Sequence, residues 1–513
     1  MTLRHPARAV LCLLVAALLS ACGTRLPDEA FSGQQVVTAD GAVGDAGSGA
    51  GVRGASRGGA TSSGQPAAGT GGPAADPTGD VAADDAAGGG DPGAQPGTAE
   101  GGGGGGASGP NQASDVGVTE STIRIGNITA ENGVLGDTFA PAVRGLRAWV
   151  QATNAAGGIN GRKVELFTCD DREDRARSLE CARRLVEQDQ VFALLATNSR
   201  ALGGASQYLA DKGVPVIGFP ISNGFYRYPN MFTIYGAGYP RDGETVGRGG
   251  DIVTLTGQYR WYKQNLKVSK AAVFGYDISE SSQAADQFVA ALRAEGFDVT
   301  QYTVSFAAPS FDQAVADMQQ RGTEIIFDAM DDGANRRLCD SMGRRNFKPK
   351  AKVSTVVVMG ESIGRNYNET CRDIVHVSVE ALPYSSGAAP VKEFRDAYAR
   401  YQPGVPLHQW ALEAWATGRI AADALRSMGP APTRQGFVEH LNTMAPNTAG
   451  GIHVGLVFRP DAFDYASEVS KAPDCFGITR FQPGEGWVLV SDPFPFCYPD
   501  ARNVATKARE QGN

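Results

Sequence analysis

Downstream of residue 22, the sequence has no apolar run long enough to span a membrane. It has no cluster of basic residues interleaved with aromatic side chains and a formal net charge of only −8, so nucleic acid is not expected as a partner. It has no C-x-x-C pair and its five histidines are scattered, so no metal site is predicted. Its glycine-rich runs lack the G-x-x-x-x-G-K-[ST] pattern of a phosphate loop, and no cofactor is expected.

The first 22 residues have the pattern of an export signal. Arg4 and Arg8 precede an apolar stretch, residues 9–19, that is too short to cross a bilayer. The stretch leads into Leu-Ser-Ala-Cys, which resembles the bacterial lipoprotein signal, whose cysteine becomes the lipidated first residue of the mature chain. The resemblance predicts a lipid on Cys22 and an extracytoplasmic location, anchored to the cell membrane. An ordinary signal peptide with a chance cysteine is the alternative.

Residues 23–116 are dominated by glycine, alanine, aspartate, proline, serine and threonine, with an unbroken glycine run at 101–106. Such a segment cannot bury enough apolar surface to offset the entropy lost on ordering, so it is predicted to be a disordered linker. As a flexible coil of about 95 residues it would reach roughly 50–60 Å. The remaining residues, about 390, are enough for two domains.

The cysteine count favours disulfides. Of the eight cysteines, Cys12 leaves with the signal and Cys22 takes the lipid, so six remain in an exported chain. Six cysteines allow fifteen pairings, and reduced thiols are the alternative. Sequence proximity favours Cys169 with Cys181, Cys339 with Cys371, and Cys475 with Cys497.

Between residues 117 and 222, short apolar runs alternate with segments of helical period. The apolar runs are 123–128, 164–167, 191–195 and 214–217, and the helical segments are 139–155, 174–187 and 201–211. This alternation predicts β–α–β units and a parallel sheet. Ligands of such sheets bind at the carboxyl ends of the strands. Candidate binding residues at these ends are Thr129, Asn132, Thr197, Asn198, Ser199 and Ser222.

The second half repeats the pattern and predicts a second sheet. Strands are expected at 232–234, 271–274, 299–304, 325–327 and 353–358, and helices at 242–264, 283–294, 311–320 and 334–345. The segment 407–428 is expected to be the longest helix, and residues 453–498 to form strands. Residues after about 500 are polar and are expected to fray.

The segments GVTESTIRIG, NAAGGINGRKVEL, DD, ARRLVEQDQVFALL and ADKGVPVIG resemble the type I periplasmic binding proteins of the branched-chain amino-acid class. The resemblance is specific over roughly residues 115–222 and weaker to about 460. It implies an α/β fold with two doubly wound parallel-sheet lobes joined by three crossovers. Lobe 1 is expected at 117–240 plus 385–445, lobe 2 at 241–384 plus 446–500, and a tail at 501–513.

The family binds a small ligand in the cleft between its lobes and delivers it to an ATP-driven permease. The resemblance therefore implies a binding protein rather than an enzyme, with an ABC permease as partner and hinge closure as mechanism. We expect a small polar ligand, an amino acid or a related carboxylate or amide. A sensor domain on the same fold is an alternative function.

Two kinds of ligand contact are expected for a zwitterion. Ser199 aligns with the family's carboxylate-binding serine and Ser222 lies near its binding threonine, although both could be simple helix caps or turns. For the ammonium group, the strand ends of lobe 2 offer Tyr276, Asp331 and Glu361, and family members often have an acid near the last position. Ser281 stands where the family has a tyrosine, which argues against a leucine-like ligand.

The strongest enzyme signal is the G-x-S-x-G motif centred on Ser362, which follows an apolar strand as in a hydrolase nucleophile elbow. The residues after the motif are polar and have no helical period, whereas an elbow serine must open a helix. A loop near the ligand is therefore the favoured interpretation, and a secreted serine hydrolase is the less favoured one.

Overall fold

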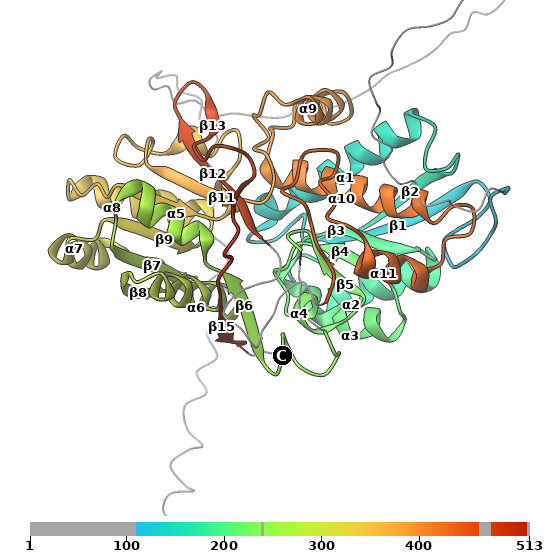
Figure 1. Ribbon diagram of the computed structural model, residues 1–513, viewed down its shortest axis with the longest axis horizontal. Coiled ribbons are helices and arrows are strands. Elements are labelled where there is room, and N and C mark those ends of the chain that lie inside the picture. Colours follow the sequence, from blue (N-terminus) through green and yellow to red (C-terminus); the bar gives the residue numbers. More distant parts are fainter. Residues whose placement is uncertain (1–108, 237–240, 461–472, 510–513) are drawn as a thin grey trace, which may run out of the picture. The chain divides into compact units, whose positions relative to one another are not determined.

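The computed structural model describes residues 109–236, 241–460 and 473–509. The predicted export signal, the predicted lipidation site at Cys22 and nearly all of the predicted linker lie outside the described residues. Within the described ranges, no helix is both long enough and apolar enough to cross a bilayer. Two β-sheets, each flanked by helices, form two lobes (Figure 1).

Lobe 1 is built on a five-stranded parallel sheet in the order β2-β1-β3-β4-β5. Its strands are β1 (Thr122–Thr129), β2 (Lys163–Asp170), β3 (Ala193–Thr197), β4 (Val216–Gly218) and β5 (Met231–Thr233). The connecting helices are α1 (Gly136–Ala155), α2 (Arg175–Arg183), α3 (Gly203–Asp211) and α4 (Gly224–Arg227). The predicted β–α alternation of this region is confirmed.

A later part of the chain returns to lobe 1 and covers α1. It contributes α9 (Ala389–Tyr401), α10 (Gln409–Ser427) and α11 (Arg434–Thr443). The close approach of α10 to α1 requires glycine, because a Cβ on Gly145 would lie 2.0 Å from the carbonyl oxygen of Ala411. A Cβ on Gly418 would lie 2.2 Å from the ring of Trp149. At 19 residues, α10 is one residue shorter than α1, so the expected longest helix is only the second longest of these described helices.

Lobe 2 is built on an eight-stranded mixed sheet. Its parallel strands are β7 (Lys270–Tyr276), β8 (Asp298–Val304), β9 (Ile325–Ala329), β10 (Ala351–Ser354) and β11 (Val375–Val379). Its antiparallel extension consists of β12 (Asp474–Gln482), β13 (Gly486–Leu489) and β14 (Phe496–Tyr498). Its helices are α5 (Gly257–Leu266), α6 (Ser279–Ala294), α7 (Asp312–Arg321) and α8 (Asp332–Arg344).

A charged pair lies in the centre of this second sheet. Lys352 on β10 and Asp328 on β9 have fully buried side chains, and Nζ lies 2.7 Å from Oδ2. Ser354 and Asn335 each donate a hydrogen bond to Oδ1 of the same carboxylate at 2.9 Å. A buried pair of charges is tolerated only when its remaining hydrogen-bonding capacity is filled, as it is here.

The chain passes between the lobes three times: from β5 to β6 (Asp251–Leu255), from β11 to α9, and from α11 to β12. The second and third crossovers lie side by side, because Leu382 donates its N–H to Ile452 O at 2.8 Å and Val454 donates to Glu380 O at 2.9 Å. The prediction of two parallel-sheet lobes with three crossovers is therefore confirmed.

The structure corrects several boundaries. The predicted fraying tail contains β15 (Asn503–Lys507), which pairs antiparallel with β6 because the edge of β6 offers unpaired backbone groups. The predicted helix at 242–264 is β6 followed by α5, and the predicted strand at 353–358 stops at Ser354 and continues as a 3₁₀ turn. The linker ends before residue 116, since Gln112 N–H donates to Pro430 O at 3.0 Å in lobe 1.

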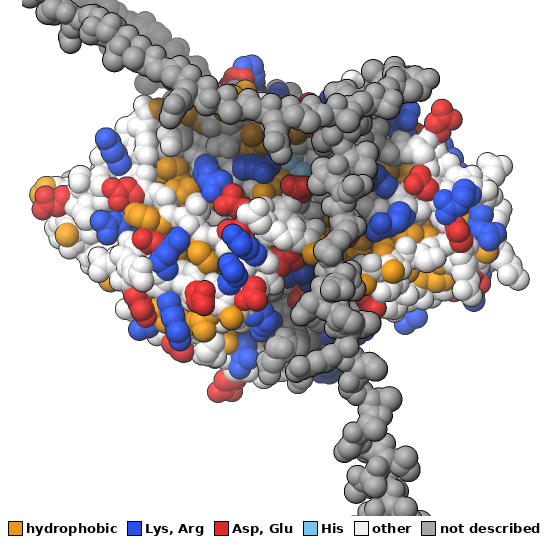
Figure 2. Space-filling model, turned by 180° about the vertical axis from the view of Figure 1, so that it is seen from behind, with side chains coloured by type: hydrophobic (Ala, Val, Ile, Leu, Met, Phe, Trp, Pro, Cys, Tyr) orange, Lys and Arg blue, Asp and Glu red, His pale blue; other side chains and the backbone are white. Residues whose placement is uncertain are grey.

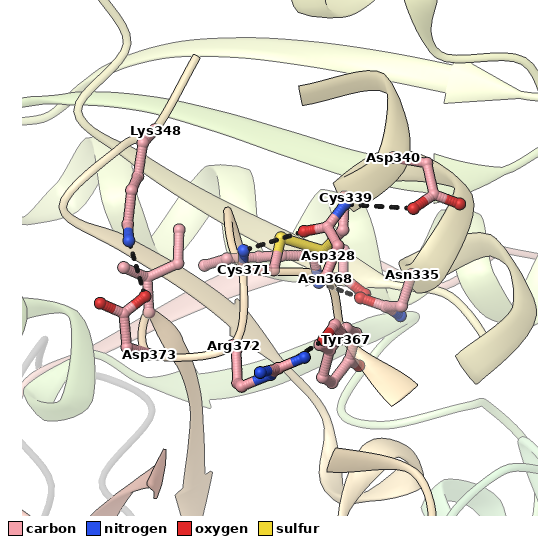
Figure 3. Close-up of a disulfide and its surroundings, with 12 residues drawn as sticks. Asp328, Asn335, Cys339, Asp340, Lys348, Tyr367, Asn368, Cys371, Arg372 and Asp373 are labelled. Carbon is pink, nitrogen blue, oxygen red and sulfur yellow. Dashed lines mark hydrogen bonds and ion pairs between the residues drawn. A yellow bond between two sulfur atoms is a disulfide. The ribbon is translucent and has the colours of Figure 1, made fainter. Parts of the chain in front are cut away.

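Three disulfides join the cysteine pairs that sequence proximity favours, with S–S distances of 1.96, 2.06 and 2.11 Å in chain order. Cys339 on α8 is linked to Cys371 in the loop before β11 (Figure 3). The same loop is held by two further contacts, from Asn368 Nδ2 to Asp340 at 3.1 Å and from Lys348 to Asp373 at 2.7 Å. The bridge therefore fixes a loop that borders the sheet of lobe 2.

Candidate ligand-binding cleft

A cleft of about 350 Å³ lies between the lobes, and side chains of both lobes line it. Aromatic rings dominate its walls. They include Phe139, Phe219 and Trp410 from lobe 1, Tyr235 from the first crossover, and Tyr276, Phe288 and Phe306 from lobe 2. Acidic and basic side chains are interspersed on the face shown in Figure 2.

The lobe 1 rings form one packed unit. Trp410 lies in the first turn of α10, where His408 Nδ1 accepts its backbone N–H at 3.1 Å and begins the helix. The Trp410 ring stacks on Phe139 of α1 with centroids 5.7 Å apart and packs on Phe219 at 5.4 Å. The returning helix thereby supplies one apolar wall of the cleft.

Arg200 supplies the only basic side chain among the described residues of the cleft wall. Its guanidinium pairs through Nε and Nη2 with Oε2 of Glu173, and the Nε distance is 3.2 Å. The other oxygen of Glu173 accepts the backbone N–H of Leu135 at 2.6 Å, just before α1. Arg200 Cζ also lies 5.4 Å from the ring centroid of Phe306, so this side chain reaches from lobe 1 to lobe 2.

Tyr276 and Asp331 form the facing polar pair on lobe 2. The Tyr276 hydroxyl donates to Asp331 Oδ2, and burial together with this carboxylate raises the pKa of Tyr276 well above its usual value. Asp331 Oδ1 accepts the Ala334 N–H at 3.2 Å and so caps α8. Ser281 accepts the Tyr276 N–H at 2.7 Å and donates to Ala329 O, which fixes the loop between β7 and α6.

Of the nine ligand-binding residues that the sequence predicts, only Tyr276 and Asp331 line this cleft. Thr129 is fully buried and donates to Asn127 Oδ1 at 2.9 Å. Ser199 caps the 3₁₀ turn Arg200–Leu202 through the Ala201 N–H at 3.0 Å. The hydroxyls of Thr129 and Ser199 therefore stabilise the chain at the ends of β1 and β3, inside lobe 1.

The other lobe 1 predictions also lie beneath the cleft wall or outside it. Thr197, Asn198 and Ser222 are each at most 2 % exposed, and Ser222 Oγ accepts the Gly224 N–H at 3.3 Å. Thr197 Oγ1 and Asn198 Oδ1 are buried without a hydrogen-bond partner among the described residues. Asn132 is exposed and donates to Asp170 Oδ2 at 2.6 Å.

Glu361 does not line the cleft, and its carboxylate contacts nearby residues instead. Its Oε1 lies 3.2 Å from Arg365 Nη2, one helical turn later in the chain, and its Oε2 accepts the Leu407 N–H at 3.2 Å. The carboxylate therefore joins this loop to the segment before α10. It does not line the cleft together with Asp331.

The hydrolase interpretation fails on geometry. Ser362 is exposed and lies eight residues after the end of β10 at Ser354, with the 3₁₀ turn Val356–Val358 between them. The nearby imidazole of His408 contacts the backbone through both ring nitrogens, with Val357 O 3.2 Å from Nε2 and the Trp410 N–H on Nδ1. The strand–turn–helix arrangement of a nucleophile elbow is absent at this position.

Sequence reasoning missed Arg200, Phe306 and Trp410. Arg200 directly follows a predicted binding residue at a strand end, so its position alone could have suggested it. Phe306 comes from the loop after β8 and Trp410 from the returning helix, and neither position carries a local signal. No group of three His, Cys, Asp or Glu side chains suited to a metal ion occurs in the described ranges.

Comparison with known proteins agrees with the cleft between two lobes. A family model described as periplasmic binding protein matches residues 122–461. The chain belongs to the periplasmic binding protein family. It is a family of solute-binding proteins rather than enzymes, in agreement with the geometry at Ser362.

Individual members of this family are distant. The chain is 26 % identical over 201 residues to the Leu/Ile/Val-binding protein homolog 1 of Brucella abortus (strain 2308), an alignment covering 39 % of this chain and 51 % of that protein. The chain thus spans about half the length of the curated relatives it matches.

Two solved structures show the same fold. A fatty acid ABC transporter substrate-binding protein from Thermomonospora curvata has a TM-score of 0.56 at 14 % identity, covering 75 % of this chain and 94 % of the other. A solute-binding protein of an ABC transporter from Rhodopseudomonas palustris BisB5, in complex with 3,4-dihydroxy benzoic acid, has a TM-score of 0.55 at 14 % identity, covering 76 % and 98 %.

Proposed function

We propose that this chain is the solute-binding component of an ABC importer and that it binds an amino acid or a related small carboxylate or amide. The observation that supports this most directly is the charge arrangement of the cleft. Arg200 on lobe 1 and Asp331 on lobe 2 face one space between aromatic walls. Opposite charges on opposite lobes suit the two ends of a zwitterion.

Each ligand end has a prepared partner in this proposal. A carboxylate would meet the guanidinium N–H groups of Arg200 that do not point at Glu173, and the hydroxyl of Thr138, which also lines the cleft. An ammonium group would meet Asp331 and the rings of Tyr276 and Phe306, whose centroids are 5.1 Å apart. The apolar body of the ligand would then lie against Phe219 and Trp410.

The relatives' names support a ligand with a carboxylate group more strongly than they support one particular structure for the rest of the ligand. They refer to leucine, isoleucine and valine, to a fatty acid, and to 3,4-dihydroxy benzoic acid. These molecules share a carboxylate and differ in the rest. The aromatic walls of this cleft accept an apolar body, and Asp331 favours one with an amino group.

Lobe closure is the mechanism that follows from this arrangement. A ligand that contacts both Arg200 and Asp331 stabilises the state in which the lobes are close, and so shifts the population toward it. An ABC permease would recognise that closed state. We also propose that lipidated Cys22 and the linker hold the lobes near the membrane outside the cytoplasm.

A thermal-shift screen of the mature chain against amino acids, small carboxylates and amides tests the ligand class. Ligand at a hundred times its dissociation constant should add about 2.7 kcal/mol to the free energy of unfolding. The same ligand should change the tryptophan fluorescence, and Trp410→Phe should remove most of that change while keeping a thermal shift. A screen in which no solute of these classes stabilises the chain would refute the proposal.

Two cellular measurements test transport and anchoring separately. Cells lacking the chain should lose uptake of the identified solute, and unchanged uptake together with a lost response would favour a sensor instead. Cys22→Ala should move the chain from the membrane fraction to the soluble fraction. Continued membrane association of this variant would contradict the lipid anchor.

A further inference from the structure

A second compartment of about 490 Å³ adjoins the cleft and borders the crossovers. The two spaces share wall residues, including Tyr235, Phe288 and Val356. The two spaces therefore lie next to each other at these residues. No residue in the wall of this compartment was predicted from the sequence to bind ligand.

The second compartment is acidic. Its only charged side chains among the described wall residues are Glu380, at the start of the second crossover, and Asp474, the first residue of β12. Asp474 Oδ2 accepts the Gly257 N–H at 2.6 Å, whereas the Glu380 carboxylate forms no ion pair with any described residue. The wall contains no lysine, arginine or histidine within the same described set.

Among the described residues, the groups that act on the Glu380 carboxylate from the neighbouring elements carry no positive charge. Tyr235 comes from the first crossover, Tyr259 from α5, Glu413 from α10 and Asp474 from β12, and all four lie within electrostatic range. His453 on the third crossover is neutral, because burial lowers its pKa to about 4. Burial and then Asp474 raise the pKa of Glu380 to about 7.

Two further observations indicate that the second compartment can bind a ligand. The Ser378 hydroxyl lies in its wall, is buried, and has no hydrogen-bond partner among the described residues. The rings of Tyr235 and Tyr259 line the space beside the carboxylate. A carboxylate, a free hydroxyl and aromatic rings are the groups that together hold an organic ammonium ion.

We propose that the second compartment binds an ammonium group at the end of the ligand's side chain, with Glu380 as its counter-ion, so that the solute is a basic amino acid. This proposal rests on the proposed function. The α-carboxylate and α-ammonium groups take Arg200 and Asp331 in the cleft, and the side chain extends past Tyr235. The ligand then carries a net positive charge, which suits walls with more acidic than basic side chains.

Lysine and norleucine test the proposal, because norleucine is lysine without its terminal ammonium group. Calorimetry should show lysine binding at least about tenfold more tightly than norleucine, as expected for a charge-assisted contact in a buried site. Glu380→Gln should reduce the affinity for lysine to that for norleucine. Glu439→Gln, which changes an exposed glutamate on α11, is the matched control and should leave both affinities unchanged.

The pH dependence gives a second readout on the unaltered chain. An ammonium ion requires the ionised form of Glu380, so the affinity for lysine should rise from about pH 6 to about pH 8, while lysine itself stays protonated. The affinity for norleucine should stay nearly flat over the same interval. This measurement tests whether ionised Glu380 binds the side-chain ammonium group even if Glu380→Gln fails to fold.

The outcomes separate this inference from the proposed function. Norleucine binding as tightly as lysine, or a lysine affinity that does not change with pH, overturns the second ammonium site and leaves solute capture intact. Tight binding of only anionic or uncharged solutes also overturns it. A screen in which no amino acid, carboxylate or amide binds removes both.

Discussion

Replacement of Arg200 by glutamine tests the central assignment of the cleft. The side chain is the only basic group among the described cleft residues, and Glu173 orients it from behind. Glutamine keeps a polar amide but is two bonds shorter than arginine, and it removes the charge and the fork geometry. The free energy of ligand binding should therefore fall, and the free energy of unfolding should fall by a separately measurable amount.

The magnitude follows from the contacts. A hydrogen bond to a charged group contributes about 1.5–3 kcal/mol, so the affinity for norleucine should fall roughly 10- to 150-fold. The Glu173 side chain, 7 % exposed, loses its ion-pair partner but keeps the Leu135 N–H, so stability should fall by about 1–3 kcal/mol. Calorimetry measures the first quantity and urea unfolding the second.

Arg419→Gln is the matched control for Arg200→Gln. Arg419 lies on α10 of the same lobe, its side chain is 27 % exposed against 23 % for Arg200, and it pairs with Glu393 away from the cleft. This variant should bind norleucine normally. Arg200→Lys should recover only part of the affinity, because lysine lacks the planar fork. A folded Arg200→Gln variant with unchanged affinity would show that Arg200 does not hold the carboxylate.

Three further outcomes are expected. Burial and Glu380 raise the pKa of Glu413 to about 8, so the protonated carboxyl stabilises the fold fully below about pH 4.5, and this stabilisation is lost as pH rises through 8. In urea unfolding at several pH values, Glu413→Gln should flatten this decline in the free energy of unfolding. An unchanged decline in the variant would contradict the role of Glu413. The double variant Cys339→Ala/Cys371→Ala, which opens a loop of 32 residues, should cost about 3–4 kcal/mol by the same assay, and no loss would contradict the stabilising role. Ser199→Ala should cost about 1 kcal/mol of stability as a lost cap, and an affinity loss as large as that of Arg200→Gln without any change in stability would instead indicate direct ligand contact.

Much of the fold could be predicted because its signals are local. A parallel strand buried on both faces is a short apolar run, and a covering helix has a 3.6-residue period, so both sheets were predictable from order and spacing. The three disulfides were favoured by nearness in sequence, and Tyr276 and Asp331 by their places at strand ends. Each of these signals lies within a few tens of residues of the feature it predicts.

The pairing of β15 with β6 had no such signal. The strand Asn503–Lys507 is short and mostly polar, and none of its residues is fully buried, so its own composition predicts fraying. It is ordered because β6, about 250 residues earlier, presents an open edge to it. Backbone hydrogen bonds between segments far apart in the sequence stabilise this strand, and the residues next to it give no sign of that pairing.

The sequence by itself determined the alternating strands and helices of both sheets and the strand ends that border the cleft, and its resemblance to a known family implied the two lobes and their three crossovers. Only the tertiary structure decided which side chains at those ends face the ligand: Ser199 turns inward as a cap and the next residue, Arg200, reaches across to Phe306. It also brought Trp410 and Glu380 to neighbouring spaces from separate parts of the chain. The physical reason is that the apolar period of a strand or helix can be recognised from neighbouring residues. A cavity is formed by packing between segments that are far apart in the sequence.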